Sequence, residues 1–403
     1  MVLFLIFAFC FNILPPTFTF TGGTEVSGEG SLFNQVFWIG VLALSISTVL
    51  NNKKPIGGIV FQAMPLVIFC ALFVVSSFWS LATDITFRRS ILELIVIANI
   101  LISVSMLKNT SHAFVILYRV ASITILFECT MLFRANGFDE VGLFRGIHAQ
   151  KNVLGLVGAI SILAGIWIRT TGASLSKYWN TAYLLGWFSL LMISQSKTSL
   201  GLILLAPAIA LGLRRLGRNF GVGVGIPLLV IFGLAYSVFA ITFISGIDVG
   251  HDISNWIHRI GFTGRDGIWN FLIARFLERP WLGYGYGGFW DIGANAPNVR
   301  YGIGFITQIN QAHNGYLDLL LALGVLGFAT YLYVVIGFVT RLSAAERVSQ
   351  NSTLALCWVF FVFSLLHNLT ETTLARGYSL VWVVQLVAMA ITYRMAFEAK
   401  GAR

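Results

Sequence analysis

The residues best suited to chemistry lie in and beside one polar segment of an otherwise apolar chain. The segment TGRDGIWNFLIARFLERPWLGYGYGGFW, residues 263–290, is basic and aromatic, and QAHNGYLD follows at 311–318. Arg265 could bind phosphate through its planar fork, and His313 could accept a proton near pH 7. A surface arginine and a histidine at the mouth of a membrane span would give the same pattern, so both readings stay open here.

Further cations occur in two other segments. Arg145, Lys151 and Asn152 lie in FRGIHAQKNVLG, and Lys197 lies in SQSKTSLG. In the topology described below, all of them share one membrane face with Arg265 and His313. Several cations near a headgroup plane suit a phosphate-bearing lipid, because charge-assisted bonds to phosphate are strong. Each could instead be an ordinary loop charge, and Lys197 could extend to the interface from a span end.

Aromatic residues in the polar segment suggest contact with sugars or with lipid. Tyr284 and Tyr286 alternate with glycines, and Trp281 and Trp290 flank them. Such rings could stack on a glycan, or they could form an aromatic belt at the headgroups. GYGYGG does not match a phosphate-binding fingerprint, because no strand precedes it and its glycine spacing is different.

Several familiar catalytic patterns are absent from the sequence. We find no Walker loop, no G-x-S-x-G, no close carboxylate pair that marks a glycosidase-like site and no Asp-x-Asp pair. The four cysteines lie in apolar runs without the spacing of a zinc site or a disulfide framework. We therefore expect no metal and no cofactor, and chemistry that depends on cations and a histidine.

The composition indicates a helical membrane protein. Of 403 residues, 57% are hydrophobic and 10% charged, and the mean hydropathy is +0.83. Apolar runs of about 20 residues, the length that crosses a bilayer, recur along the chain. The sequence predicts an all-α polytopic protein with about 12 transmembrane helices, at roughly 2–20, 32–50, 56–81, 90–107, 112–133, 152–169, 180–195, 198–213, 220–247, 314–340, 353–368 and 377–394.

The predicted spans divide the chain into three parts. Residues 1–247 hold helices one to nine, 248–313 form one large loop, and 314–403 hold helices ten to twelve and a tail. The basic turns NNKK and RRLGR favour cytoplasmic termini, which places the large loop outside the membrane, in the periplasm if the host is a bacterium with two membranes. The basic excess, a net charge of +10, therefore indicates membrane orientation and not nucleic-acid binding.

One element is predicted within the loop, and three ionisable residues within the spans need an explanation. Asp266 to Glu278 has the pattern of an amphipathic helix, with Pro280 after its end. Arg88 and Arg89 are interpreted as interfacial anchors. Three charges inside spans are costly in a bilayer, and we expect them to pair with each other or to face a cavity: Glu93, Arg119 and Glu128.

Four segments in order resemble a known family. RGIHAQKNVLGL, SQSKTSLGLILL, the segment at 263–290 and HNGYLDLLLALGVLG surround the large loop. The last fits a pattern of His-Asn, nine residues and Gly-x-x-Gly at His313, Asn314, Gly324 and Gly327. Over residues 140–340 the chain resembles the O-antigen ligase and polymerase superfamily of bacterial envelope proteins, and most of all exopolysaccharide polymerases of the Wzy type.

The resemblance implies a fold, a reaction and roles for residues. Members are similar to metal-independent glycosyltransferases with a GT-C-like membrane fold, which take a glycan from undecaprenyl pyrophosphate at the periplasmic face. By resemblance, His313 is the catalytic base, and Arg265 is catalytic and binds pyrophosphate together with Lys197, Arg145 and Lys151. Relatives often have arginine where this chain has Lys197, and the usual form of IHAQKN has histidine next to the lysine. The expected glycan-binding residues are Asn314, Tyr284, Tyr286 and Trp290.

Two reactions and two other protein classes compete. A polymerase extends a lipid-linked glycan by one repeat unit, whereas a ligase passes the glycan to an acceptor such as lipid A–core. A transporter would place charges near the midplane in broken, repeated helices, and no repeat is visible. A scaffold protein would not need cations from four segments on one side. Expected partners are the lipid-linked oligosaccharide, a glycan acceptor, the inner membrane, and a chain-length regulator and a flippase.

Overall fold

The computed structural model describes residues 1–14, 32–52, 57–173, 176–220, 265–348 and 351–401. In this part of the chain the regular structure is helical, and the only β-type pairing is an isolated bridge between Phe138 and Phe144. Seven of the described helices are long and apolar enough to cross a membrane, and two apolar helices are shorter. The prediction of an all-α polytopic membrane protein is therefore confirmed. The predicted span at 220–247 lies outside the described residues.

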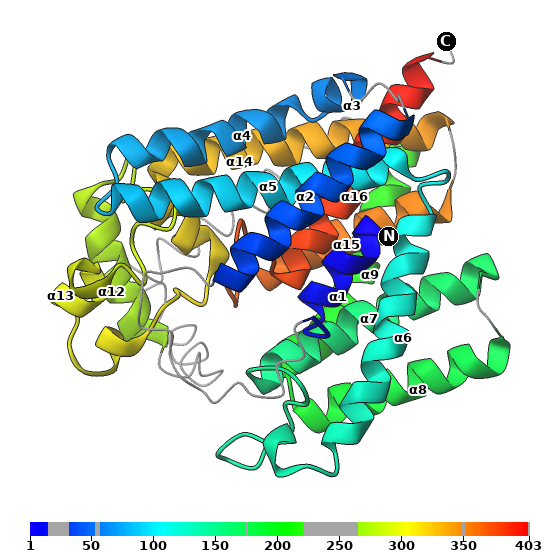
Figure 1. Ribbon diagram of the computed structural model, residues 1–403, viewed down its shortest axis with the longest axis horizontal. Coiled ribbons are helices and arrows are strands. Elements are labelled where there is room, and N and C mark those ends of the chain that lie inside the picture. Colours follow the sequence, from blue (N-terminus) through cyan, green and yellow to red (C-terminus); the bar gives the residue numbers. More distant parts are fainter. Residues whose placement is uncertain (15–31, 53–56, 174–175, 221–264, 349–350, 402–403) are drawn as a thin grey trace.

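The main layer is a set of long helices that lie side by side along the longest axis (Figure 1). Helix α16 is the most buried of the seven candidate spans, and it packs against α5, α14 and α15. The elements of this layer are α2 (Leu32–Asn52), α3 (Gly57–Gln62), α4 (Met64–Val75), η1 (Ser76–Phe78), α5 (Thr83–Met106), α14 (Gly315–Val348), α15 (Ser352–His367) and α16 (Leu380–Gly401).

A second group of helices packs on one side of this layer. Helices α7 and α8 form an antiparallel pair, in which Tyr183 donates a hydrogen bond to the carbonyl of Ser161. Helix α9 contacts both α7 and α15, and so joins the group to the layer. The elements are α1 (Val2–Cys10), α6 (His112–Met131), η2 (Ala135–Gly137), α7 (Lys151–Thr171), α8 (Lys177–Ser194) and α9 (Lys197–Phe220).

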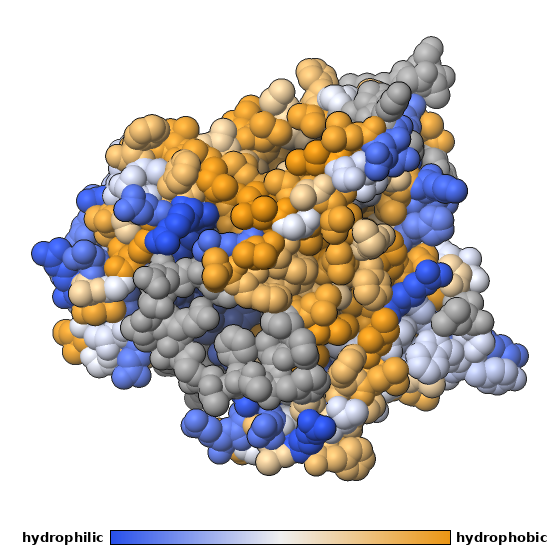
Figure 2. Space-filling model, viewed as in Figure 1, coloured by the Kyte–Doolittle hydropathy of each residue, from blue (hydrophilic) through white to orange (hydrophobic). Residues whose placement is uncertain are grey.

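The surface is consistent with a protein surrounded by lipid. Figure 2 shows hydrophobic surface across the middle of one face, with hydrophilic residues at the end where α12 and α13 lie and at the opposite end. Large apolar side chains point outward from α2, including Ile39 and Leu50. Exposed apolar area of this extent is unusual for a protein surrounded by water and is expected in a bilayer.

Three predicted helix boundaries are wrong, each for a local reason. The predicted span 2–20 begins as α1, whose helix ends at Cys10. Nine residues reach about 14 Å along a helix, roughly half the apolar thickness of a bilayer. The predicted span 56–81 is divided at Ala63, after which α4 starts at Met64 with Pro65 in its first turn. Helix α5 begins at Thr83, not near residue 90.

The polar loop forms a small helical cap at one end of the layer. Its elements are α12 (Arg265–Glu278), η3 (Gly293–Asn295), α13 (Pro297–Tyr301) and η4 (Gly304–Gln308), and α12 confirms the predicted amphipathic helix. The cap has its own apolar core of Ile268, Trp269, Leu272 and Phe289 among others. It lies over the end of α4 and the start of α5, where Trp79 donates to the carbonyl of Leu282.

Arg89 fastens the cap to α5. Its guanidinium donates to the backbone carbonyls of Gly287, of Trp290 at 2.9 Å and of Asp291 at 3.2 Å. Arg89 was interpreted from the sequence as a headgroup anchor, but these three bonds give it a structural role. Below it, the Glu93 carboxylate accepts from Trp382 at 2.6 Å and from the Tyr286 hydroxyl at 3.2 Å, so the cost of burying Glu93 is offset by hydrogen bonds.

Candidate functional site

One carboxylate joins the two residues that the sequence singled out. Oε1 of Glu371 lies 3.1 Å from an Arg265 terminal nitrogen, and Oε2 lies 3.1 Å from Nδ1 of His313. Arg265 also donates to the carbonyl of Thr370 at 2.6 Å. His313 is the most exposed of the three side chains, at 29%, against 18% for Arg265 and 15% for Glu371. The partly exposed imidazole of His313 is therefore held in place by the largely buried ion pair of Arg265 and Glu371.

The turn that carries Glu371 is built on the end of α15. Asn368 Oδ1 accepts from the backbone nitrogens of Thr373 and Leu374 at 2.9 and 2.8 Å. The amide of Gly315 donates to the carbonyl of Asn368 at 2.9 Å. A Cβ on Gly315 would lie 2.1 Å from Asn368 Oδ1, so only glycine lets α14 start this close. These contacts fix Glu371 relative to His313.

The residues around His313 are occupied by structural bonds. Asn314 Oδ1 caps α14 by accepting from the amides of Tyr316 and Leu317 at 3.0 and 3.1 Å, a favourable N-cap geometry. Asp318 Oδ2 accepts from the amide of Ala312 at 3.1 Å. His313 itself has φ 50, a left-handed conformation that costs free energy in a residue with a side chain. The carboxamide oxygen of Asn314 is therefore already hydrogen-bonded within the protein. The predicted contact of Asn314 with a glycan stays a prediction.

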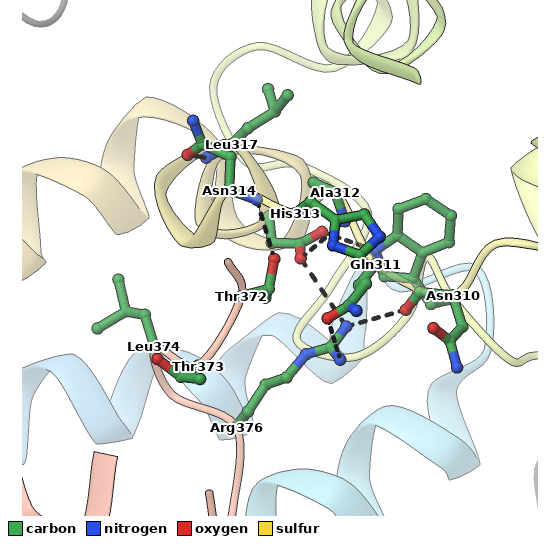
Figure 3. Close-up of polar contacts among 12 residues, drawn as sticks. Asn310, Gln311, Ala312, His313, Asn314, Leu317, Thr372, Thr373, Leu374 and Arg376 are labelled. Atoms are coloured by element: carbon green, nitrogen blue, oxygen red, sulfur yellow. Dashed lines mark hydrogen bonds and ion pairs between the residues drawn. The ribbon is translucent and has the colours of Figure 1, made fainter. Parts of the chain in front are cut away.

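Arg376 lies on the other side of the histidine segment. Figure 3 shows it extending from the irregular connection after Thr372 towards Asn310 and Gln311. It donates to the carbonyl of Asn310 at 2.9 Å and lies 3.8 Å from Asp318 Oδ2. Arg376 from the 368–379 connection thus binds the segment that leads to His313, whereas Arg265 from α12 binds the carboxylate that contacts His313.

The surroundings of Glu371 keep its carboxylate ionised. Burial raises its pKa, but the bond from His313 and the charges of Arg265, His313 and His367 outweigh burial, and the pKa is lowered from its ordinary 4.5. The folded protein therefore favours the ionised form. The resulting stabilisation is fully present above the ordinary pKa and is lost as the pH falls through the lowered one.

A second group of cations lies at two neighbouring helix starts. Lys151 is the first residue of α7 and Lys197 the first residue of α9. A Cβ on Gly155, one turn into α7, would lie 2.3 Å from Cβ of Ser196, so the two starts are packed together. Within the described residues neither lysine forms an ion pair. Helix starts carry partial positive charge that attracts anions, and two lysines there strengthen the attraction.

Arg145 belongs to the connection that leads into α7. Its terminal nitrogen donates to the carbonyl of Ala149 at 3.3 Å. The connection is held by a buried pair, since Oε1 of Glu128 lies 3.0 Å from Nε2 of His148. Glu128 Oε2 also accepts from the amide of Ile147 at 3.2 Å. Glu128 was expected to pair with another of the charges inside the spans or to face a cavity, but its partner is His148, which the sequence did not single out.

Both cation groups lie at the same end of the helix layer. Arg214, near the end of α9, pairs with Glu346, near the end of α14, so α9 and α14 start at the same end. Arg394, late in α16, donates to the carbonyls of Val104 and Leu107 at the end of α5. The predicted grouping of Lys151, Lys197, Arg265 and His313 at one end is therefore what the structure has.

Two of the three aromatic residues predicted to bind glycan are buried, and the third, Tyr286, is half-buried. Tyr284 is 4% exposed and Trp290 8%. Tyr284 donates to Glu278 at 2.9 Å and Trp290 to Asp318 at 2.7 Å, and the ring of Tyr286 stacks on Phe73 at 4.3 Å. Trp281, which the sequence grouped with them, is 73% exposed. In this arrangement the buried rings of Tyr284 and Trp290 and the half-buried ring of Tyr286 stabilise the cap, whereas Trp281 is exposed.

Sequence reasoning missed Glu371 and Arg376. Both lie in TETTLARG, the short connection between the last two predicted spans. A signal was present, because this connection is at the same end as His313 and contains two charged residues close together. No spacing pattern linked it to His313, which is 58 residues away from Glu371 along the chain.

The fold and the site define a class, a polytopic α-helical membrane protein with cations and a histidine gathered at one end. Residues 181–332 match a family model described as O-antigen ligase. The match includes Lys197, Arg265, His313 and Asn314, and it confirms the resemblance to the O-antigen ligase and polymerase superfamily. This domain supports a membrane glycosyltransferase-like function for the chain. A comparison with curated proteins found no match.

Proposed function

We propose that this protein is a metal-independent glycosyltransferase that polymerises oligosaccharide repeat units linked to undecaprenyl pyrophosphate. The observation that carries the proposal is the joint placement of Arg265 and His313 on one carboxylate, with the imidazole partly exposed. The matched domain supports the same class of reaction. The product would be exopolysaccharide or O-antigen.

In the proposed reaction His313 acts as the general base. An acceptor hydroxyl gives its proton to the imidazole, and its oxygen forms a bond to the anomeric carbon of the donor glycan. The bond from that carbon to the pyrophosphate oxygen breaks, and the electron pair leaves with the pyrophosphate. The imidazolium then releases the proton to solvent or to the pyrophosphate. Base catalysis of this kind contributes roughly 10²–10⁴-fold.

Cations stabilise the leaving group in this scheme. Negative charge grows on the bridging oxygen as the bond breaks, so preorganised positive charge there lowers the barrier. Lys151 and Lys197 offer charges that no described acid neutralises, at two helix starts. Arg265 uses one N–H on each terminal nitrogen for Thr370 and Glu371, which leaves three of its five donors. Arg145 completes the proposed pyrophosphate group.

Ligation to lipid A–core or another acceptor is the second candidate, and the family model's description favours it. The same base and the same cations would serve a ligase, because the two reactions differ in the acceptor. A transporter is the least favoured reading, since the cations gather at one end of the helix layer and not midway along it.

The proposed setting is the inner membrane of a bacterium, with the site facing the periplasm. The basic residues at the opposite end of the layer, among them Arg214, Arg341 and Arg394, support this orientation through the positive-inside rule. The partners we propose are the lipid-linked oligosaccharide, the glycan acceptor, a chain-length regulator and a flippase.

The test is the size distribution of the host's surface glycan with His313→Ala, at matched protein level. We expect only single repeat units, because chain growth would lack its base. His112→Ala is the matched control, since His112 is an exposed histidine at the start of α6; we expect it to keep the normal size distribution. Long chains that stay on the lipid carrier would identify a ligase. An unchanged glycan would contradict the assignment of His313 and of the reaction.

A further inference from the structure

We propose that Glu371 is a positioning residue that decides which nitrogen of His313 takes the acceptor's proton. The inference rests on the proposed function, because it matters only if His313 is the base. It concerns a residue outside the segment that matches the ligase family model. Glu371 itself does not touch the reacting atoms; it acts through His313 and Arg265.

The chemistry of the carboxylate sets the tautomer. An ionised carboxylate only accepts hydrogen bonds, and Glu371 is held in that form by its surroundings. At 3.1 Å from Glu371 Oε2, the Nδ1 of His313 must therefore carry the proton. In a neutral imidazole the other nitrogen, Nε2, is then the acceptor. The ring nitrogen that does not contact Glu371 is thus the one prepared to take a proton from a hydroxyl.

The same contact supports the imidazole after the proton has moved. When Nε2 becomes protonated the ring is positive, and the carboxylate beside Nδ1 stabilises that charge. The charged or titratable groups that face Glu371 are Arg265 from α12, His313 from the start of α14 and His367 from the end of α15. Arg265 binds the other carboxylate oxygen, so it limits rotation of the carboxylate and holds Oε2 towards His313.

Rigid surroundings suit a positioning role. The Glu371 turn is fastened by the bonds of Asn368, and the amide of Gly315 donates to the carbonyls of Asn368 and of Glu371 itself, at 2.9 and 3.1 Å. The amide of Asn314 donates to the Thr372 hydroxyl at 3.2 Å (Figure 3). The backbone on both sides of the His313–Glu371 contact is therefore fixed, and the φ of 50 at His313 is maintained by these contacts.

Glu371→Gln is the informative change. Arg265 only donates, so it takes the oxygen of the new amide, and the amide nitrogen then faces Nδ1. That nitrogen also donates, so Nδ1 must accept, and the proton moves to Nε2. The variant keeps size and shape but inverts the tautomer. We expect kcat to fall about 10²–10⁴-fold, with KM for the lipid-linked donor changed less than threefold, and Glu371→Asp to recover part of the loss.

The direct measurement is ¹⁵N NMR of the purified, histidine-labelled full chain, with the His313 signal assigned from His313→Ala. We expect the proton on Nδ1 in the wild type and on Nε2 in Glu371→Gln. Transfer is measured with lipid-linked oligosaccharide extracted from host membranes. Glu398→Gln is the matched control, because Glu398 pairs with Arg394 at the other end of the layer, and it should leave both readouts unchanged.

The outcomes separate this inference from the proposed function. If His313→Ala is inactive while Glu371→Gln keeps its kcat, the positioning role is wrong and the base remains. If His313→Ala is fully active, the proposed function fails first. A proton on Nε2 in the wild type overturns the inference even if Glu371→Gln does not fold.

Discussion

At the scale of single residues, the site divides its cations between two tasks. Arg265 is bonded to Glu371 and Thr370 and organises the histidine. Lys151 and Lys197 have no described acid beside them and can respond to an incoming anion. An arginine fork suits the first task, because it holds fixed acceptors, whereas a lysine suits a ligand that arrives and leaves. A lysine at position 197 therefore suits the proposed pyrophosphate role.

Lys197→Ala should lower transfer with little effect on folding. A charge-assisted contact to phosphate is worth about 1.5–3 kcal/mol, which corresponds to about a ten- to hundredfold loss of kcat/KM. Lys197→Arg should stay within a few-fold of the wild type, because the charge is kept. Lys177→Ala is the control, since Lys177 starts α8 at the opposite end of the α7–α8 pair. Equal effects of the two alanine variants would contradict a phosphate role for Lys197.

At the scale of elements, the cap is joined to the layer through a break in α14. Gly324 has φ 64 and ψ −163 inside this helix, so backbone groups on both sides lose their helical partners. The cap supplies new ones. The amides of Tyr284 and Gly285 donate to the carbonyls of Leu321 and Ala322 at 2.8 Å, and the amide of Val325 donates to Pro280 at 2.8 Å. The cap therefore fixes the direction of the first turns of α14, which follow His313.

Gly324→Ala should destabilise the protein. Its φ suits glycine, and a Cβ would lie 2.3 Å from the backbone of Trp281, so the chain must shift or break the docking. We expect a cost of about 1–3 kcal/mol, measured as a lower melting temperature in detergent. Gly40→Ala in α2 is the control, because a Cβ there meets nothing within 4 Å and alanine is the better helix former. Identical melting of both variants would argue against the docking.

At the scale of the whole molecule, the two ends of the helix layer differ in character. The cap, the Glu371 turn and the starts of α7, α9 and α14 lie at one end. The other end holds the arginines of α14 and α16, with Arg341 bonded to Gln62. A site confined to one end fits a donor whose lipid carrier already places the pyrophosphate at the membrane surface.

Cysteine labelling from outside the cell tests this polarity. Gln308→Cys, exposed in the cap, should react with a membrane-impermeant maleimide in intact spheroplasts, and Ala344→Cys, exposed late in α14, should react after permeabilisation. Cys129 is exposed among the native cysteines, so Cys129→Ser provides the background. Labelling with the reverse pattern would place the site on the cytoplasmic side and remove the proposed reaction.

The sequence alone determined the class of fold, the amphipathic helix in the loop and the placement of His313, Arg265, Lys151 and Lys197 at one end. These features follow from side-chain hydropathy and local sequence pattern, which do not depend on knowing which residues contact each other. The sequence did not predict the helix break at Gly324, because the apolar run continues across it. Hydropathy carries no information on the hydrogen-bond partners of the backbone.

Only the tertiary structure decided which residues meet. Glu371 is 106 residues from Arg265 and 58 from His313 along the chain, and no spacing rule relates them. The aromatic residues of the cap looked suited to stacking on sugars, but packing turned Tyr284, Tyr286 and Trp290 inward. A sequence fixes what each side chain can do. Which other residue a side chain contacts depends on the free energy of packing distant segments together. That free energy is a property of the folded chain.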